Sequence, residues 1–100
     1  DTVYRGTTPT HTFTLPFEAS QLSEAYITYA QNNQVVIEKM LSECTVDGKN
    51  LSVTLTQTET LGLMAISNTE IQIAAKVNGK VLRSNIISVP TERILKDGEI

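Results

Sequence analysis

Apolar and polar residues alternate with a period of two in several short stretches of the chain. In Thr10–Phe17, the residues His11, Phe13, Leu15 and Phe17 share one face, and threonines occupy most of the other. Successive side chains of a strand point to opposite faces, so this stretch predicts a strand with one buried face. A proline near its end suits an edge strand, because proline has no N–H to donate to a neighbour.

Further stretches with strand character follow, and turn signals separate them. Asn32-Asn33 and Asn78-Gly79 predict tight hairpins, because Asn and Gly tolerate positive φ, and Asp47–Asn50 predicts another turn. In the Asn32-Asn33 hairpin the two faces do not separate under the simplest register, so we expect a bulge or a longer loop. In the Asn78-Gly79 hairpin we expect either burial of both faces or a bulge near Ser84-Asn85. The predicted strands after the first are Ala25–Gln31, Gln34–Leu41, an edge segment within Ser42–Val46, the start of Leu51–Leu63, Asn68–Val77 and Val81–Val89.

The stretch Leu51–Leu63 changes character halfway along. It begins as an alternating strand, but Thr56 and Glu59 then have the spacing of a capping box, which predicts a helix start. We therefore expect one short helical turn near residues 57–61, with Leu61 and Leu63 packed under the sheet. A strand that leads into a capped turn is a corner, where the chain crosses from one sheet to another.

About six or seven short strands, with no long amphipathic helix, predict an all-β fold, an antiparallel β-sandwich. A chain of 100 residues is long enough for one such domain. We place a polar N-terminal lead-in at 1–9, the sandwich at 10–90 and a C-terminal tail at 91–100. The tail is charged and partly apolar, and we expect it to cap the open end of the sandwich or to pair with a neighbouring chain.

Charge and composition exclude some partners. The formal net charge is −3 at pH 7, and the basic residues are scattered, so we expect no nucleic acid as a partner. We expect no membrane insertion either, because no apolar run approaches the roughly 18 residues that a span needs. No signal peptide is visible, but the chain begins at Asp1, so a removed leader stays open.

The candidates for chemistry are few. His11 and Cys44 are the single histidine and the single cysteine. A zinc site needs about four ligands, and a nucleophilic pair needs an orienting group and an oxyanion hole, so neither residue is predicted to bind metal or to act in catalysis. We interpret His11 as a ring packed at a sheet end and Cys44 as a small buried side chain. The carboxylates are dispersed and no glycine-rich phosphate loop occurs, so we predict no catalytic, cofactor-binding or metal-binding residue.

Two runs of threonines at every second position suggest at first a flat binding face. They comprise Thr8 to Thr14 and Thr54 to Thr60. A regular array would require stacked repeats, which the chain lacks. We interpret the runs as the solvated faces of two strands.

Three motifs together resemble a known family. They are Arg5–Leu15 (RGTTPTHTFTL), Val53–Leu61 (VTLTQTETL) and Glu70–Ile73 (EIQI), and the closing Ile94–Gly98 (ILKDG) is similar to the usual ending of that family. The chain resembles small proteins of about this length that prophages of Gram-positive gut bacteria encode among their structural and tail genes. The resemblance implies an immunoglobulin-like sandwich and provides no catalytic residue.

The resemblance also implies a function. We expect a non-enzymatic phage structural protein, a tail- or baseplate-associated adaptor or assembly module that is made in the bacterial cytoplasm and located in the virion. Its partners would be other phage structural proteins, or further copies of itself through strand edges or the C-terminal tail. The alternative is a secreted or cell-surface β-sandwich module that recognises protein or carbohydrate. Few aromatic residues and no tryptophan weigh against sugar binding.

Overall fold

The structure is a computed structural model that describes residues 3–65, 67–84 and 86–92. Within these ranges it is all-β with one short α-helix, which confirms the predicted fold class. It contains more strands than expected, because two two-residue strands form near the chain ends and the stretch Val81–Val89 divides into two. The strands are β1 (Val3–Tyr4), β2 (Thr10–Thr14), β3 (Leu22–Gln31), β4 (Gln34–Met40), β5 (Thr45–Asp47), β6 (Asn50–Thr54), β7 (Thr69–Val77), β8 (Lys80–Arg83), β9 (Ile87–Val89) and β10 (Thr91–Glu92); the helix α1 is Gln57–Leu61, and the 3-10 turns η1 and η2 are Ala19–Gln21 and Leu41–Glu43.

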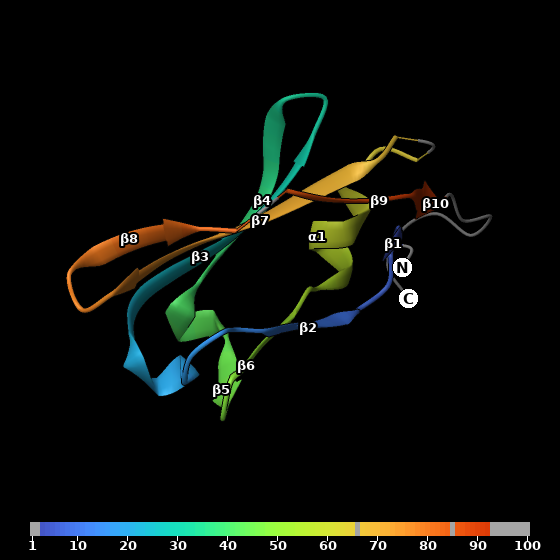
Figure 1. The fold of residues 1–100 in the computed structure, drawn as a ribbon. Helices are drawn as coiled ribbons and strands as arrows, with labels where there is room; N and C mark the ends of the chain where they lie inside the picture. The colour runs from blue at the N-terminus through green and yellow to red at the C-terminus, as the bar shows by residue number, and fades with distance from the viewer. Residues whose placement is uncertain (1–2, 66, 85, 93–100) are drawn as a thin grey trace.

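Two antiparallel sheets form the layers of the sandwich (Figure 1). The larger sheet has the order β4-β3-β7-β8, and β9 also pairs with β7. The smaller sheet has the order β2-β6-β5. The helix α1 lies between the layers at the end where β1 and β10 pair, and the β7–β8 hairpin forms the opposite end (Figure 1).

The core lies between the layers and follows the period of two. On β7 the predicted face is buried, from Ile71 to Val77, while the intervening residues are more exposed. Ile27 and Tyr29 of β3 are fully buried against Leu51 and Val53 of β6. Complete burial of one such side chain contributes roughly 1.5–3 kcal/mol, so these inward residues hold the two sheets together.

The β3–β4 hairpin contains the expected irregularity. Asn32 and Asn33 form its turn with φ of 52° and 63°. Ala30 is opposite Val35, but Tyr29 is opposite Ile37, so one extra residue of β4 bulges between these pairs. The bulge restores the buried face of β4, which a two-residue turn alone would misplace. β3 itself begins earlier than predicted, at Leu22 instead of Ala25.

The β7–β8 hairpin has the predicted turn. Of the two alternatives predicted for the returning strand, an irregular register is observed and burial of both faces is not. Asn78 and Gly79 have φ of 51° and 79°, as a type I′ turn requires. Ala75 is opposite Leu82, as the two-residue turn predicts, but Ile71 is opposite Ile87, so the register shifts by one residue beyond Arg83. Burial of both faces is the prediction that is wrong, because all four residues of β8 are exposed.

The corner after β6 is confirmed. Glu59 N–H donates to Thr56 Oγ1 at 3.2 Å, and Thr56 N–H donates to Glu59 Oε1 at 2.8 Å, which is the reciprocal pattern of a capping box. Leu63 is buried and Leu61 half-buried. A 3-10 turn, η1, forms earlier in the chain after Glu18, which makes no side-chain cap hydrogen bond.

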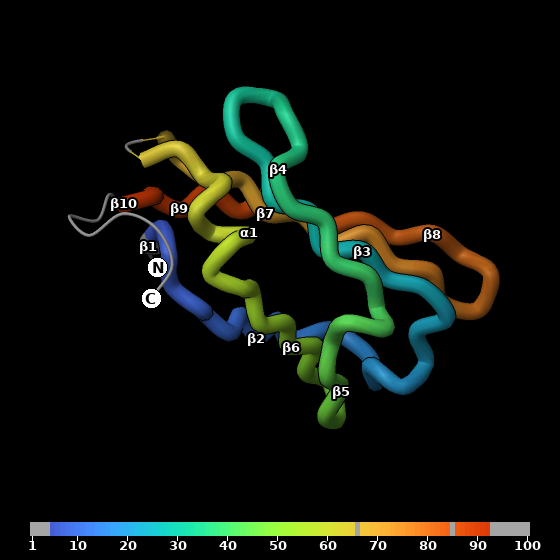
Figure 2. Tube along the Cα trace, turned by 180° about the vertical axis from the view of Figure 1, so that it is seen from behind, coloured from blue at the N-terminus to red at the C-terminus, as the bar shows by residue number. Residues whose placement is uncertain are grey.

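The lead-in and the start of the tail meet at one end of the molecule. β1 and β10 pair in parallel, and Arg5 N–H extends this pairing to the Glu92 carbonyl at 3.3 Å. The Arg5 guanidinium donates to the carbonyls of Leu61 and Leu63, which the end of α1 leaves without helical partners. Figure 2 shows β9 and β10 leading to the same end as β1. The rest of the tail, 93–100, lies outside the described residues.

Candidate functional site

His11 lies at the junction of the two sheets and not in an open site. Its Nδ1 is 2.7 Å from the Tyr29 hydroxyl, and the two rings are tilted with centroids 5.6 Å apart. Burial lowers the pKa of His11 and raises the pKa of Tyr29, because the charged form of each group loses hydration. The ring of His11 therefore packs within the sandwich, and the partner of Nδ1 is a tyrosine hydroxyl.

A second polar cluster lies between the sheets at η2 and α1. Lys39 is 6 % exposed, and its Nζ is 2.7 Å from Glu59 Oε2 and 3.5 Å from Glu43 Oε2. Burial alone would lower the pKa of Lys39, but the hydrogen bond and charge of Glu59, with Glu43, outweigh it and raise the pKa. Desolvation alone would raise the pKa of Glu59, but Lys39 and Thr56 lower it overall. Both partners are therefore held in the charged state, which suits a structural ion pair and not proton transfer at neutral pH.

Cys44 lies close to this cluster but is not activated by it. Its Sγ donates to the Met40 carbonyl at 3.4 Å, and its side chain packs partly buried against the core. Burial and then the charge of Glu43 raise the pKa of the thiol, although Lys39 acts in the opposite direction. A raised pKa keeps the thiol protonated and weakens it as a nucleophile. The hydrogen bond of Cys44 goes to the Met40 carbonyl, and that of His11 goes to the Tyr29 hydroxyl.

Metal ligands and membrane segments give no further candidate. In the part of the chain that the structure describes, no three His, Cys, Asp or Glu side chains form a group that could hold a metal ion. The same residues contain no helix that is long and apolar enough to cross a membrane.

The threonine runs separate into two groups with different roles. The threonines of β2 face outward and form cross-strand hydrogen bonds with β6, from Thr10 to Thr54 at 2.7 Å, from Thr12 to Ser52 at 2.9 Å and from Thr14 to Asn50 at 3.0 Å. This part of the solvated-face prediction is confirmed. It is wrong for the second run beyond Thr54, because Thr56 caps α1 and Thr60 is fully buried.

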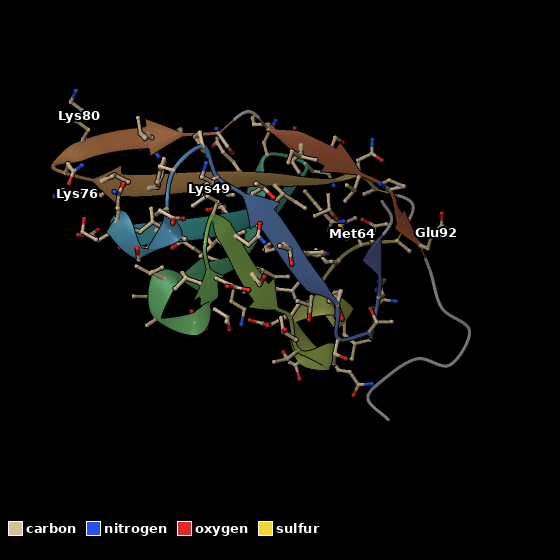
Figure 3. The ribbon with its side chains drawn as sticks, turned by 60° about the horizontal axis from the view of Figure 1, so that its bottom comes forward. Lys49, Met64, Lys76, Lys80 and Glu92 are labelled. Atoms are coloured by element: carbon tan, nitrogen blue, oxygen red, sulfur yellow. The ribbon has the colours of Figure 1, made fainter. Side chains whose placement is uncertain are left out.

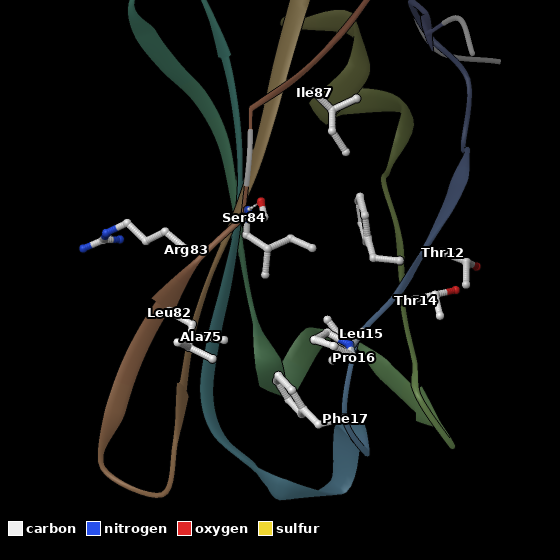
Figure 4. A pocket seen from close by; sticks show the side chains of 12 residues that line it. Thr12, Thr14, Leu15, Pro16, Phe17, Ala75, Leu82, Arg83, Ser84 and Ile87 are labelled. Atoms are coloured by element: carbon white, nitrogen blue, oxygen red, sulfur yellow. Dashed lines mark hydrogen bonds between the residues drawn. The ribbon is translucent and has the colours of Figure 1, made fainter.

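An apolar groove opens on one side of the sandwich, between the segment Thr12–Phe17 and the strands β7, β8 and β9. Its volume is about 580 Å³. Figure 4 shows Leu15, Phe17 and Ile87 directed into this space, while the Arg83 side chain points away. We call it the β2 groove, and its apolar lining consists mainly of Phe13, Leu15, Phe17, Ile73, Leu82 and Ile87.

One wall of the β2 groove presents backbone groups as well as side chains. Leu55 N–H donates to the Pro9 carbonyl at 2.9 Å, and Leu15 N–H donates to the Lys49 carbonyl at 2.8 Å. The backbone N–H and C=O groups of the odd-numbered residues between them therefore point toward β6. Because backbone groups alternate along an antiparallel strand, the three threonines of β2 direct their N–H and C=O groups to the opposite edge. At that edge, β2 has no neighbouring strand within the described residues.

The other wall of the groove exposes aliphatic side chains. Leu82 and Ile87 are each 47 % exposed, and both lie on the inner face of the large sheet, opposite Ala75 and Ile71 respectively. The sequence indicated that β2 is an edge strand, through Pro16, but not that its open edge lies beside β8 and β9. That proximity depends on which sheet each strand joins, and no local signal encodes it.

Comparisons with protein-family models, with curated proteins and with solved structures found no match.

Proposed function

We propose that this chain is a non-enzymatic structural protein of a prophage-encoded particle, an adaptor or assembly module of the tail or baseplate that acts through protein–protein contacts. The observation that carries the proposal is the edge of β2 beside the β2 groove, which no strand of the described residues covers. Unpaired strand edges add strands from other chains, and an apolar groove adds side-chain pockets to the backbone contacts.

The titratable groups support a structural role. Inside the sandwich, His11 bonds to Tyr29, and Lys39 bonds to Glu59. None of these four residues lines the β2 groove, whose lining is mostly apolar. The lining includes hydroxyl side chains but no His, Cys, Asp, Glu or Lys that could activate them or transfer a proton, which suits binding better than catalysis. The resemblance of the motifs at Arg5–Leu15 and Val53–Leu61 to prophage proteins supports the place in the virion.

Particle composition tests this proposal. A lysogen whose prophage encodes the chain is induced, and particles are purified on a density gradient and analysed by quantitative mass spectrometry. We expect the chain in a fixed ratio to the tail proteins, and an in-frame deletion should yield particles with incomplete tails. Intact infectious particles that lack the chain would contradict the proposal. Recovery of the chain from the medium or the cell wall would instead favour the secreted or cell-surface binding module.

A further inference from the structure

The outward edge of β2 differs from the other edges of the two layers within the described residues. The three threonines of β2 direct their backbone groups to this edge, because the hydrogen bonds of Leu15 and Leu55 assign the odd-numbered residues to β6. Natural sheets commonly protect their edges with charges or with very short strands. The other edge strands follow that rule: β4 contains Glu38 and Lys39, β8 contains Lys80 and Arg83, and β5 and β9 have only three residues each. β2 has five residues and no charge, so it is the edge best suited to pair with another chain.

The positions of the outward backbone groups select a second copy of β2 as the pairing strand. Thr10, Thr12 and Thr14 are symmetric about Thr12, so an antiparallel β2 related by a twofold axis at Thr12 pairs all three. Thr12 is then opposite Thr12 of the second copy, and Thr10 is opposite Thr14, with about six backbone hydrogen bonds between the strands. A register shifted by two residues places one threonine opposite Thr8 or Pro16, which lie outside β2, and proline has no N–H to donate.

The side chains of β2 suit this register on both faces. On the outer face, the threonine hydroxyls already bond to β6, and each can donate once and accept twice, so the row can continue into the second copy. On the inner face, His11 is opposite Phe13 of the second copy at a closely spaced pair, where two rings attract. No like charges meet at the axis. Figure 3 shows Lys76 and Lys80 at one end of the molecule and Glu92 at the other, with β2 between them.

A second copy at this edge also covers the mouth of the β2 groove. Leu82 and Ile87 on the far wall are each 47 % exposed, and they would face the same walls of the second copy. The edge from Thr10 to Phe17 spans roughly 26 Å, and a two-layer sandwich with its outward side chains is roughly 20 Å thick, so the contact buries about 500 Å² on each copy. The total of about 1,000 Å² reaches the lower limit for a specific interface, which predicts a weak dimer.

We propose that two copies of this chain pair through the edges of their β2 strands, antiparallel about a twofold axis at Thr12. The two small sheets then form one continuous sheet with the order β5-β6-β2-β2-β6-β5. Because the same edge serves on both copies, the contact is isologous and closes at two chains. This inference deepens the proposed function and rests on it, because it names a second copy as one protein partner.

The first test measures the solution mass of the full chain by light scattering from about 1 μM to about 1 mM. We expect one transition, from the mass of one chain to that of two. Thr12→Pro removes the outward N–H at the axis, and Thr12→Val is its matched control, because both lose the hydroxyl bond to Ser52 but only valine keeps the N–H. Thr12→Pro should weaken the dimer by at least about ten-fold in apparent Kd, and Thr12→Val by less than about three-fold.

A disulfide cross-link tests the register itself, and it stays decisive if Thr12→Pro fails to fold. In a Cys44→Ala background, Thr12→Cys places two thiols on residues whose Cα atoms are about 5.5 Å apart, within reach of a disulfide. Thr14→Cys is the matched control, because the two copies of position 14 are offset by four residues, roughly 14 Å along the strands. Mixing Thr10→Cys with Thr14→Cys should restore the cross-link between unlike chains. Peptide mapping by mass spectrometry identifies each bond.

Several outcomes would overturn the inference. They are a wild type that is monomeric at every concentration, an assembly larger than two chains, a Thr12→Pro variant that dimerises like wild type, and a cross-link at position 14 as efficient as that at position 12. Hydrogen exchange identifies a different occupant of the edge. Protection of the Thr10, Thr12 and Thr14 amides in the dilute monomer would show that the chain covers its own edge, and it would overturn the dimer too.

The particle experiment fails or succeeds separately from these tests. A chain that is monomeric in solution but present in purified particles overturns the second-copy contact and leaves the proposed function in place. A chain that dimerises through β2 but is absent from particles overturns the proposed function alone.

Discussion

The Nδ1 atom of His11 on β2 is 2.7 Å from the hydroxyl oxygen of Tyr29 on β3, and this hydrogen bond connects the two sheets across the core. Tyr29 is fully buried and belongs to the central pair β3–β7 of the large sheet. His11 belongs to the edge strand of the small sheet. The contact thus fixes the position of the edge strand that forms one wall of the β2 groove.

Removal of the Tyr29 hydroxyl should destabilise the fold. We expect Tyr29→Phe to lower the free energy of unfolding by about 1 kcal/mol, because it removes one hydrogen bond and leaves a half-buried ring nitrogen without this partner. Urea unfolding followed by circular dichroism measures the change. Tyr26→Phe is the control, since Tyr26 lies on the outer face of the same strand and is half-buried. Equal losses in the two variants would contradict the role of the His11 bond.

Stability should depend on pH through His11. Burial lowers the pKa of folded His11 below its ordinary value of 6.5, so the unfolded chain binds a proton where the folded chain does not. Stability is therefore fully present above pH 6.5 and falls as the pH drops toward the folded pKa, with a slope of at most about 1.4 kcal/mol per pH unit. Urea unfolding between pH 7.5 and pH 5 measures the slope. His11→Gln should flatten it, and an unchanged slope would show that other groups cause it.

Glu59 should contribute more to stability than Glu43, although both face Lys39. Glu59→Gln leaves the buried ammonium of Lys39 with the weaker partner and also weakens the cap of α1, so we expect a loss of about 2 kcal/mol. Glu43→Gln should cost less than about 1 kcal/mol, because the Glu43 side chain is 46 % exposed and 3.5 Å away. Lys39→Met completes a double-mutant cycle, in which the cost of Glu59→Gln should shrink when the ammonium is absent. An unchanged cost in that background would place the role of Glu59 in the cap alone.

Gln31 should be needed to hold the loop after α1. Its amide nitrogen donates to the Met64 carbonyl at 2.9 Å, and its amide oxygen accepts from Met64 N–H at 2.7 Å. The same amide reaches the buried hydroxyls of Thr69 and Thr91 at 3.3 and 3.4 Å. Gln31→Leu leaves several polar groups without this partner, so we expect a loss of about 2–3 kcal/mol.

Hydrogen exchange locates the effect of this substitution. Amides of Thr69 and Thr91 should exchange faster in Gln31→Leu, because the cluster joins β7 to β10. Gln34→Leu is the matched control, as Gln34 lies directly across the hairpin from Gln31 and is exposed. Similar exchange in both variants would show that the cluster does not hold β10.

The features that the sequence by itself determined are local ones. Alternation specified the buried face of β7, and Asn78-Gly79 specified a turn that needs two positive φ angles. Thr56 and Glu59 specified the start of α1 through bonds between residues three apart. In each case the interacting groups lie within one element or one turn, so the signal and its consequence share a short window.

Tertiary structure decided what lies far apart in the chain. The contacts of His11 with Tyr29 and of Lys39 with Glu59 join residues 18 or more positions apart, and β1 pairs with β10 across almost the whole chain. The β2 groove exists because β2 joins the small sheet while β8 and β9 join the large one. Strand partners are selected by the combined burial and hydrogen bonding of the whole core, and no single segment contains that information.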